Sequence, residues 1–142
     1  MHRAEDGSLW TVEAYLEKGA LVQPLDDFLN HGLGRIVVLR FEDPALAAKG
    51  AALAFDRIAN GAPIDYDEAF DGDDPNELFC SEIGPWAIAL AGGPTDLPRS
   101  RTAFPQDENP AFFAAMGIDA DALMAPVDML YDPRFTIVGE WR

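Results

Sequence analysis

Three observations predict an α+β fold in which an antiparallel sheet packs against helices. Short segments rich in β-branched and aromatic residues, such as 9–15 and 35–41, are typical of strands. The alanine-rich segment 44–60 follows an aspartate and begins with a proline, which is a common start of a helix. A length of 142 residues without repeats, linkers or low-complexity tracts predicts a single domain over residues 1–142.

The first 41 residues are predicted to form a hairpin, a short helix and a buried strand. Residues 9–15 and 20–23 are the two strands of the hairpin, and Pro24 opens a helix over 25–30. Residues 35–41 are a continuous apolar run between two arginines. Such a run is typical of a strand that is buried on both faces.

The helix predicted over 44–60 carries six alanines in its first eleven residues. Small side chains allow a helix to approach a sheet closely, and Leu46, Leu53 and Ile58 are expected to supply its larger buried groups.

The remaining chain is predicted to contain shorter elements. A helix over 80–90 is expected to break at Gly84 and Pro85, because proline inside a helix removes a hydrogen bond. Phe112 and Phe113 are expected in the core, with a pocket for an acyl chain as the alternative. In order, the other segments are a loop over 91–109, short helices over 110–116 and 119–124, a turn over 131–134 and a strand over 135–141.

The charge of the chain argues against several classes of partner. Twenty-five acidic and ten basic residues give a net charge of −15, which repels nucleic acids and anionic headgroups. No apolar run approaches the roughly 20 residues that span a bilayer, so no transmembrane segment is predicted. The N-terminus lacks the features of a signal peptide, so a cytoplasmic location is expected if Met1 is the genuine start, and the location is otherwise open.

Acidic residues concentrate between Asp65 and Glu77, where seven of 13 residues are aspartate or glutamate. One interpretation is a solvated loop that keeps the protein soluble. The other is a divalent-cation site, but the segment lacks the ligand spacing of an EF-hand. We therefore predict no metal and no cofactor.

The single cysteine, Cys80, directly follows this acidic loop and opens a predicted helix. The positive end of a helix dipole favours a thiolate, so the position suits a nucleophile, although unpaired cysteines are also often simply buried. A cysteine nucleophile needs a base, usually histidine. His2, close to the terminus, is expected to be disordered, and His31 is expected to be a capping or surface residue.

Four stretches of the chain carry a family likeness: the strand around Glu13 with residues 22–29, the strand over 35–40, residues 61–65 with the acidic loop and residues 78–82, and residues 125–130 with 132–135. In this order they resemble the permuted papain-like cysteine amidases, the YiiX/YebB-like branch of the NlpC superfamily. The phrase Leu78-Phe79-Cys80-Ser81-Glu82 after an acidic loop is the most specific of them.

The resemblance implies an NlpC-like fold and a cysteine hydrolase or acyltransferase that acts on amide or ester bonds. Cys80 would be the nucleophile, and Glu13 would orient a histidine. Ile64 stands where the family has a tyrosine, and nearby Tyr66 would either take that catalytic position or serve in packing. The substrate would be a small molecule, a peptide or a lipid-type acyl group.

The chain departs from the family pattern at the histidine. In the family this residue lies farther upstream of the glutamate than this chain extends, so the domain is expected to be incomplete at its N-terminus. A missing strand would expose a sheet edge and favour a homo-oligomer. The alternative is a degenerate relative without catalysis that serves as a binding or assembly module.

Overall fold

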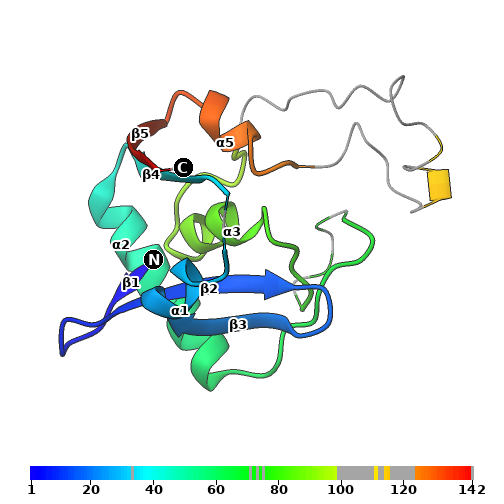
Figure 1. The fold of residues 1–142 in the computed structure, drawn as a ribbon, viewed down its shortest axis with the longest axis horizontal. Coiled ribbons are helices and arrows are strands. Elements are labelled where there is room, and N and C mark those ends of the chain that lie inside the picture. Colours follow the sequence, from blue (N-terminus) through cyan, green and yellow to red (C-terminus); the bar gives the residue numbers. More distant parts are fainter. Residues whose placement is uncertain are drawn as a thin grey trace.

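The computed structural model describes residues 1–32, 34–70, 72, 74, 76–98, 111, 114–115 and 124–141. Its strands form two antiparallel sheets beside the helices, which confirms the α+β prediction (Figure 1). In chain order the elements are β1 (His2–Arg3), β2 (Leu9–Tyr15), β3 (Gly19–Pro24), α1 (Leu25–Leu29), β4 (Ile36–Phe41), α2 (Pro44–Asn60), α3 (Ile83–Leu90), α5 (Asp128–Tyr131) and β5 (Phe135–Trp141).

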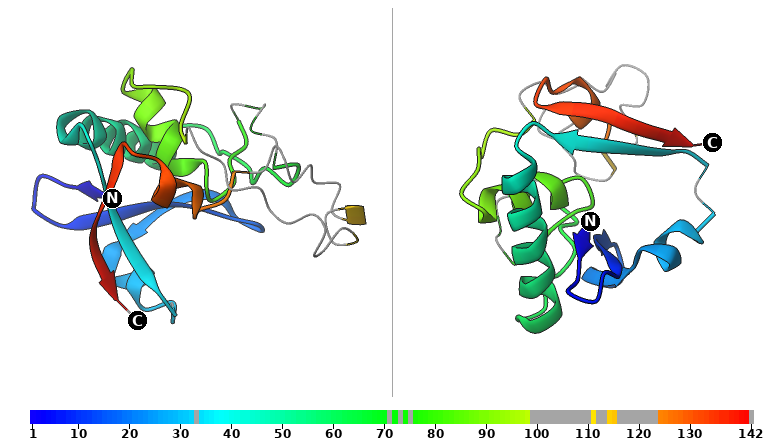
Figure 2. Two further views of the ribbon diagram at one scale, coloured as in Figure 1. Left: turned by 90° about the horizontal axis from the view of Figure 1, so that it is seen from above. Right: turned by 90° about the vertical axis from the view of Figure 1, so that its left-hand side faces the viewer.

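The first sheet has the order β1-β2-β3 and the second pairs β4 with β5 (Figure 2). The predicted hairpin is confirmed, with Val12 opposite Val22 and Tyr15 opposite Gly19. Short β1, which the sequence did not predict, pairs only with the start of β2. The expectation that His2 is disordered is wrong, because it lies in β1 and its ring stacks on Phe55 with centroids 4.7 Å apart.

Helix α2 has the predicted bounds, since the Asp43 carboxylate accepts a hydrogen bond from the Leu46 N–H at 2.9 Å and caps its N-terminus. Its buried residues are Gly50 and Ala54, whereas Leu53 is 40% exposed. The prediction for Leu53 is therefore wrong. The close contact of α2 is with another helix, α3, where Gly50 lies against the Ala87 backbone.

Strand β4 pairs with β5, but it is not buried on both faces as predicted. Most of β4 is half-buried, Arg40 is exposed and only Phe41 is fully buried. In the described chain β4 has no second strand neighbour, so one edge is open. The Phe41 side chain joins Ile88 and Leu97 in the core, and its ring lies 5.2 Å from that of Phe135.

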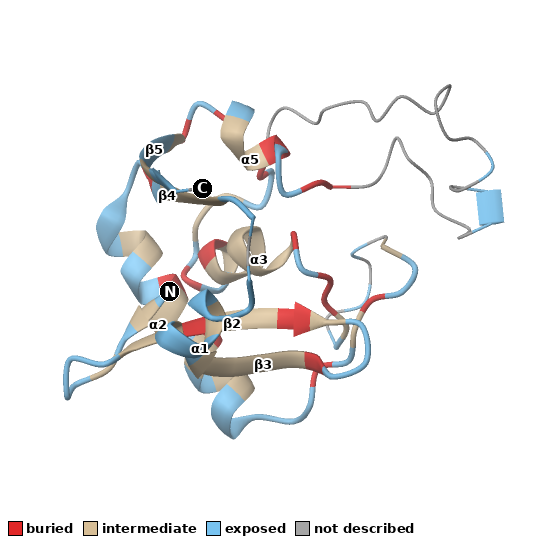
Figure 3. Ribbon diagram, viewed as in Figure 1, coloured by how far each residue is buried: buried red, intermediate tan, exposed pale blue. Residues whose placement is uncertain are grey.

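Helix α3 begins at Ile83, three residues later than predicted, and Gly84 and Pro85 do not break it. They lie in its first turn, where backbone N–H groups lack intrahelical partners and a proline is tolerated. Buried residues gather around α3 and the loops that flank it (Figure 3).

The C-terminal segment is fastened to the loop after α3 by a buried arginine. The Arg134 guanidinium is 2.7 Å from carboxylate oxygens of both Asp132 and Asp96, and these hydrogen bonds raise its pKa. The strand predicted over 135–141 is confirmed. Most of the predicted helices over 110–116 and 119–124, the pair Phe112 and Phe113, and residues 99–109 of the predicted loop lie outside the described residues.

Candidate functional site

The turn of the β2–β3 hairpin fixes the loop that leads to the candidate site. Gly19 has φ +67°, and a Cβ atom there would collide with the Ile64 carbonyl oxygen. The N–H of Ala20 donates a hydrogen bond of 2.9 Å to the same oxygen. The hairpin therefore docks against buried Ile64, two residues before Tyr66.

Residues 65–67 then run beside residues 76–78 in a short parallel arrangement. The Leu78 N–H donates to the Asp65 carbonyl at 3.0 Å, and the Asp67 N–H donates to the Leu78 carbonyl at 3.3 Å. This pairing brings Tyr66 close to the segment that carries Cys80.

Cys80 is exposed and lies in the turn that enters α3. Its neighbours Phe79 and Ser81 are buried, which fixes the backbone on both sides of the thiol. The Glu82 carboxylate accepts a hydrogen bond from the Phe79 N–H at 3.0 Å, and the Glu82 N–H donates to the Phe79 carbonyl at 3.1 Å. The bond from the Phe79 N–H to the Glu82 carboxylate corresponds to the glutamate side of a capping box. Together the two bonds close the turn that carries the thiol.

Tyr66 lies against Cys80. Burial is the largest cause that raises the pKa of Tyr66 to about 12, followed by the charge of the Cys80 thiolate and a hydrogen bond to its sulfur. A hydrogen bond to the Cys80 backbone acts in the opposite direction. The phenol is therefore protonated at neutral pH and can donate a hydrogen bond at the thiol.

Glu13 lies in a separate polar cluster on β2, here called the Glu13 cluster. Its carboxylate accepts hydrogen bonds from Thr11 Oγ1 at 2.5 Å, Gln23 Nε2 at 2.5 Å and the Tyr15 hydroxyl at 2.6 Å. Burial, followed by the bond to Glu13, raises the pKa of Tyr15. The Tyr15 oxygen is also 3.1 Å from Nδ1 of exposed His31. Glu13 is thus linked to one histidine through a tyrosine.

The structure joins Cys80 to Tyr66 but does not join either of them to Glu13. Val12 faces α2 and α3, and because strand side chains alternate, Glu13 faces the other side of the hairpin. Among the described residues, no hydrogen bond or ion pair links Cys80 to Glu13, His2 or His31.

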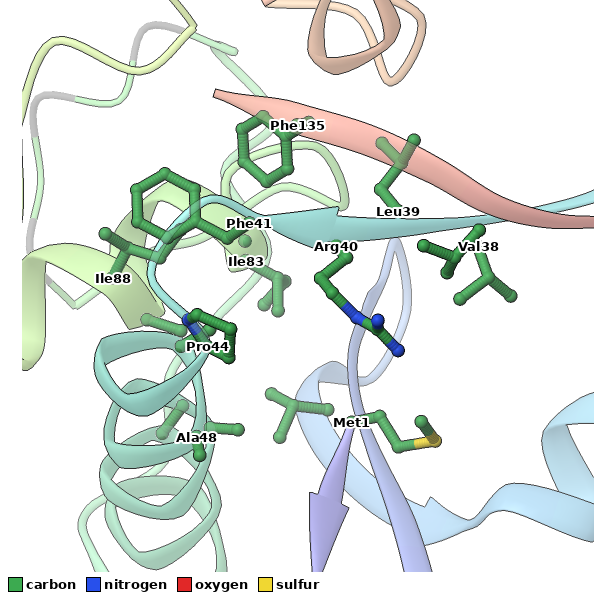
Figure 4. Close-up of a pocket in the computed structure, with 17 residues that line it drawn as sticks. Met1, Val38, Leu39, Arg40, Phe41, Pro44, Ala48, Ile83, Ile88 and Phe135 are labelled. Atoms are coloured by element: carbon green, nitrogen blue, oxygen red, sulfur yellow. The ribbon is translucent and has the colours of Figure 1, made fainter. Parts of the chain in front are cut away.

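A groove of about 380 Å³ separates the β4–β5 sheet from α2 and α3 (Figure 4). Arg40 is the one charged side chain among the described residues that line it, and Cys80 and Tyr66 are not among them. The lining residues are mostly apolar and include Val38, Leu39, Phe41, Ala48, Ile83, Ile88, Phe135 and Val138.

The model of the permuted papain-like amidase enzymes, the YaeF/YiiX or C92 family, matches residues 1–84, which is more than half of the 142-residue chain. The chain belongs to this family. The region shared with C92 amidases contains Glu13, Tyr66 and Cys80, and it ends in the first turn of α3. Searches of curated proteins and of solved structures gave no match.

The described part of this C92 family member contains no helix that is both long and apolar enough to cross a membrane.

The candidate site also includes residues that sequence reasoning missed. Asp67 is buried and its carboxylate organises the loop after it, while Phe70 adopts a positive φ of 58° beside Tyr66. Aspartate and glycine are both typical turn residues, but this signal does not separate Asp67 from the other aspartates of the acidic loop.

Proposed function

We propose that this chain is a cysteine hydrolase or acyltransferase that acts on amide or ester bonds, with Cys80 as the nucleophile. The observation that carries the proposal is the exposed Cys80 thiol at the entrance to α3, with the Tyr66 phenol against both its sulfur and its backbone. An exposed thiol that is held by buried neighbours and faces a hydrogen-bond donor suits attack on a carbonyl.

In the proposed reaction the Cys80 thiolate attacks the carbonyl carbon. A C–S bond forms and the carbonyl electrons move to oxygen, and we assign the stabilisation of this oxyanion to the Cys80 N–H and the Tyr66 hydroxyl. Collapse of this intermediate expels an amine or alcohol, which takes up the proton that the thiol released. Water or an amine then cleaves the thioester.

Glu13 is proposed to orient an imidazole, as the resemblance to the family implies. Three hydrogen-bond donors hold its carboxylate in one geometry, which suits an orienting role. In the described structure the imidazole connected to this carboxylate is that of His31, through Tyr15.

The proposed substrates are small molecules, peptides or lipid-type acyl groups. We also propose that the chain forms a homo-oligomer through the open edge of β4.

A second function is favoured by the placement of the histidines. His2 stacks on Phe55 and His31 contacts Tyr15, so neither contacts the thiol in the described part of the chain. A fold without a base beside the cysteine would serve as a binding or assembly module rather than an enzyme.

Hydrolysis of p-nitrophenyl acetate and of an acyl p-nitroanilide separates the two functions. An enzyme should release p-nitrophenol with a burst, and Cys80→Ala should reduce turnover by about a thousandfold. Glu13→Gln should reduce turnover as well. The matched control is His2→Gln, because His2 packs on Phe55 and should not affect turnover. Equal rates for the wild type and Cys80→Ala would reject the enzyme and leave the binding module.

A further inference from the structure

A buried carboxylate shapes the loop beside the candidate site. Asp67 is 3% exposed, and its Oδ1 accepts hydrogen bonds from the N–H groups of Ala69 and Phe70, both at 2.8 Å. Its Oδ2 accepts a third from the Gly72 N–H at 3.0 Å. One side chain therefore holds the backbone at residues 69, 70 and 72, and residues 67–70 with Gly72 are here called the Asp67 loop.

The Asp67 loop holds Phe70 in a strained conformation next to Tyr66. Phe70 has φ +58°, a region that non-glycine residues seldom occupy, so its neighbours must maintain it. Its ring centroid lies 6.0 Å from that of Tyr66 and 5.5 Å from that of Phe79. The ring of Phe70 thus contacts both the tyrosine and the residue that precedes Cys80.

A second contact joins the Asp67 loop to the turn around the thiol. Gly72 has φ +69°, and a Cβ atom there would lie 2.5 Å from Oε1 of Glu82. The other oxygen of Glu82 accepts the hydrogen bond from the Phe79 N–H. Glu82 is therefore in contact with both the Asp67 loop and the backbone next to Cys80.

We propose that Asp67 and Glu82 are positioning residues that fasten the Asp67 loop to the turn before α3 and so hold the Tyr66 hydroxyl at the Cys80 thiol. The inference rests on the proposed function, since it concerns the same nucleophile. Neither carboxylate is assigned a contact with substrate. Their effect on the thiol passes through Tyr66, which distinguishes them from residues that only support the fold.

The rate of Cys80 alkylation by iodoacetamide at neutral pH tests the proposal, because the chain has one cysteine and the readout needs no substrate. Tyr66→Phe removes a donor to the thiolate and should slow alkylation about fivefold, the size of one net hydrogen bond. Asp67→Asn should slow it similarly, since an amide cannot supply acceptors to all three N–H groups. In a Tyr66→Phe background, Asp67→Asn should have no further effect.

Glu82 allows an independent test. Glu82→Gln keeps an oxygen acceptor for the Phe79 N–H and should retain the wild-type rate, whereas Glu82→Ala should slow alkylation as Tyr66→Phe does. The matched control is Asp43→Ala, which removes the same kind of backbone hydrogen bond at the start of α2 and should leave the rate unchanged. Circular dichroism establishes that each variant is folded. If Asp67→Asn does not fold, Gly72→Ala replaces it and should also slow alkylation.

Two results would overturn the proposal. One is a wild-type alkylation rate in both Asp67→Asn and Glu82→Ala. The other is an equal slowing by Asp67→Asn with and without Tyr66, because the effect would then not pass through the phenol. Absence of ester hydrolysis in the wild type would instead reject the proposed function and leave the alkylation pattern intact.

Discussion

At the scale of single residues, the contact between Tyr66 and Cys80 has a consequence that can be measured without substrate. Burial and the nearby thiol raise the pKa of Tyr66 from its ordinary value of 10.0 to about 12. The folded state therefore keeps the phenolic proton at pH values where the unfolded chain loses it. The resulting contribution to stability is complete below the unfolded pKa and is lost as pH rises through the folded pKa.

We expect the difference in unfolding free energy between the wild type and Tyr66→Phe to shrink or reverse in alkaline solution. Urea unfolding at about pH 9 and about pH 11 measures this difference on both sides of the unfolded tyrosine pKa. Tyr131 is 61% exposed, so Tyr131→Phe is the control and should show little change between the two conditions. A difference for Tyr66→Phe that stays constant with pH would contradict the contact.

The residues of the site were only partly predictable. Cys80 could be selected because the phrase around it is specific. Tyr66 could be selected because it stands two residues after Ile64, the position at which the family has a tyrosine. Their contact depends on the pairing of residues 65–67 with 76–78, a tertiary feature without a sequence pattern of its own. Glu13 was placed correctly on its strand, but its hydrogen bonds to Gln23 and Tyr15 follow from hairpin register, and its catalytic role stays a prediction.

At the scale of elements, local signals predicted the boundaries well and burial poorly. The bounds of α2 follow from a cap that the sequence encodes, and β2 and β5 follow from β-branched composition. The burial of Gly50 and the exposure of Leu53 depend on which element α2 packs against. The prediction assumed a sheet, but the close partner is the backbone of α3 at Ala87.

This helix contact predicts an unusual response to alanine. Replacing a helical glycine by alanine normally favours the helix by up to about 1 kcal/mol. In Gly50→Ala the new Cβ would collide with the Ala87 carbonyl, which belongs to backbone and cannot move aside. We expect a net loss of about 1–3 kcal/mol in unfolding free energy, measured by urea denaturation.

Gly84→Ala in α3 is the matched control. Its Cβ would meet the Met129 Sδ at 3.3 Å, which is the flexible end of a side chain and can shift. This variant should be neutral or slightly stabilising. Equal effects of the two substitutions would show that the Ala87 backbone does not restrict the size of the side chain at position 50.

At the scale of the whole molecule, the two sheets of the described residues leave large apolar side chains exposed. Within the part of the chain that the structure describes, the β4–β5 sheet has two strands, and Ile137, Val138 and Trp141 are 52%, 45% and 59% exposed. Two-stranded sheets are marginally stable alone, and an open apolar edge favours pairing with another chain. The net charge of −15 opposes that pairing through repulsion between copies.

We therefore expect reversible self-association that strengthens with salt, because added ions screen the repulsion and leave the apolar contact intact. Multi-angle light scattering over a concentration series, at low and high ionic strength, measures it. Val138→Lys places a charge on the exposed sheet and should shift the molecule toward monomer. Asn60→Lys adds the same charge at the exposed end of α2, so it controls for net charge and should change the association much less. A monomer at every concentration and salt level, or equal effects of the two lysines, would show that the β4–β5 sheet does not mediate contact between copies.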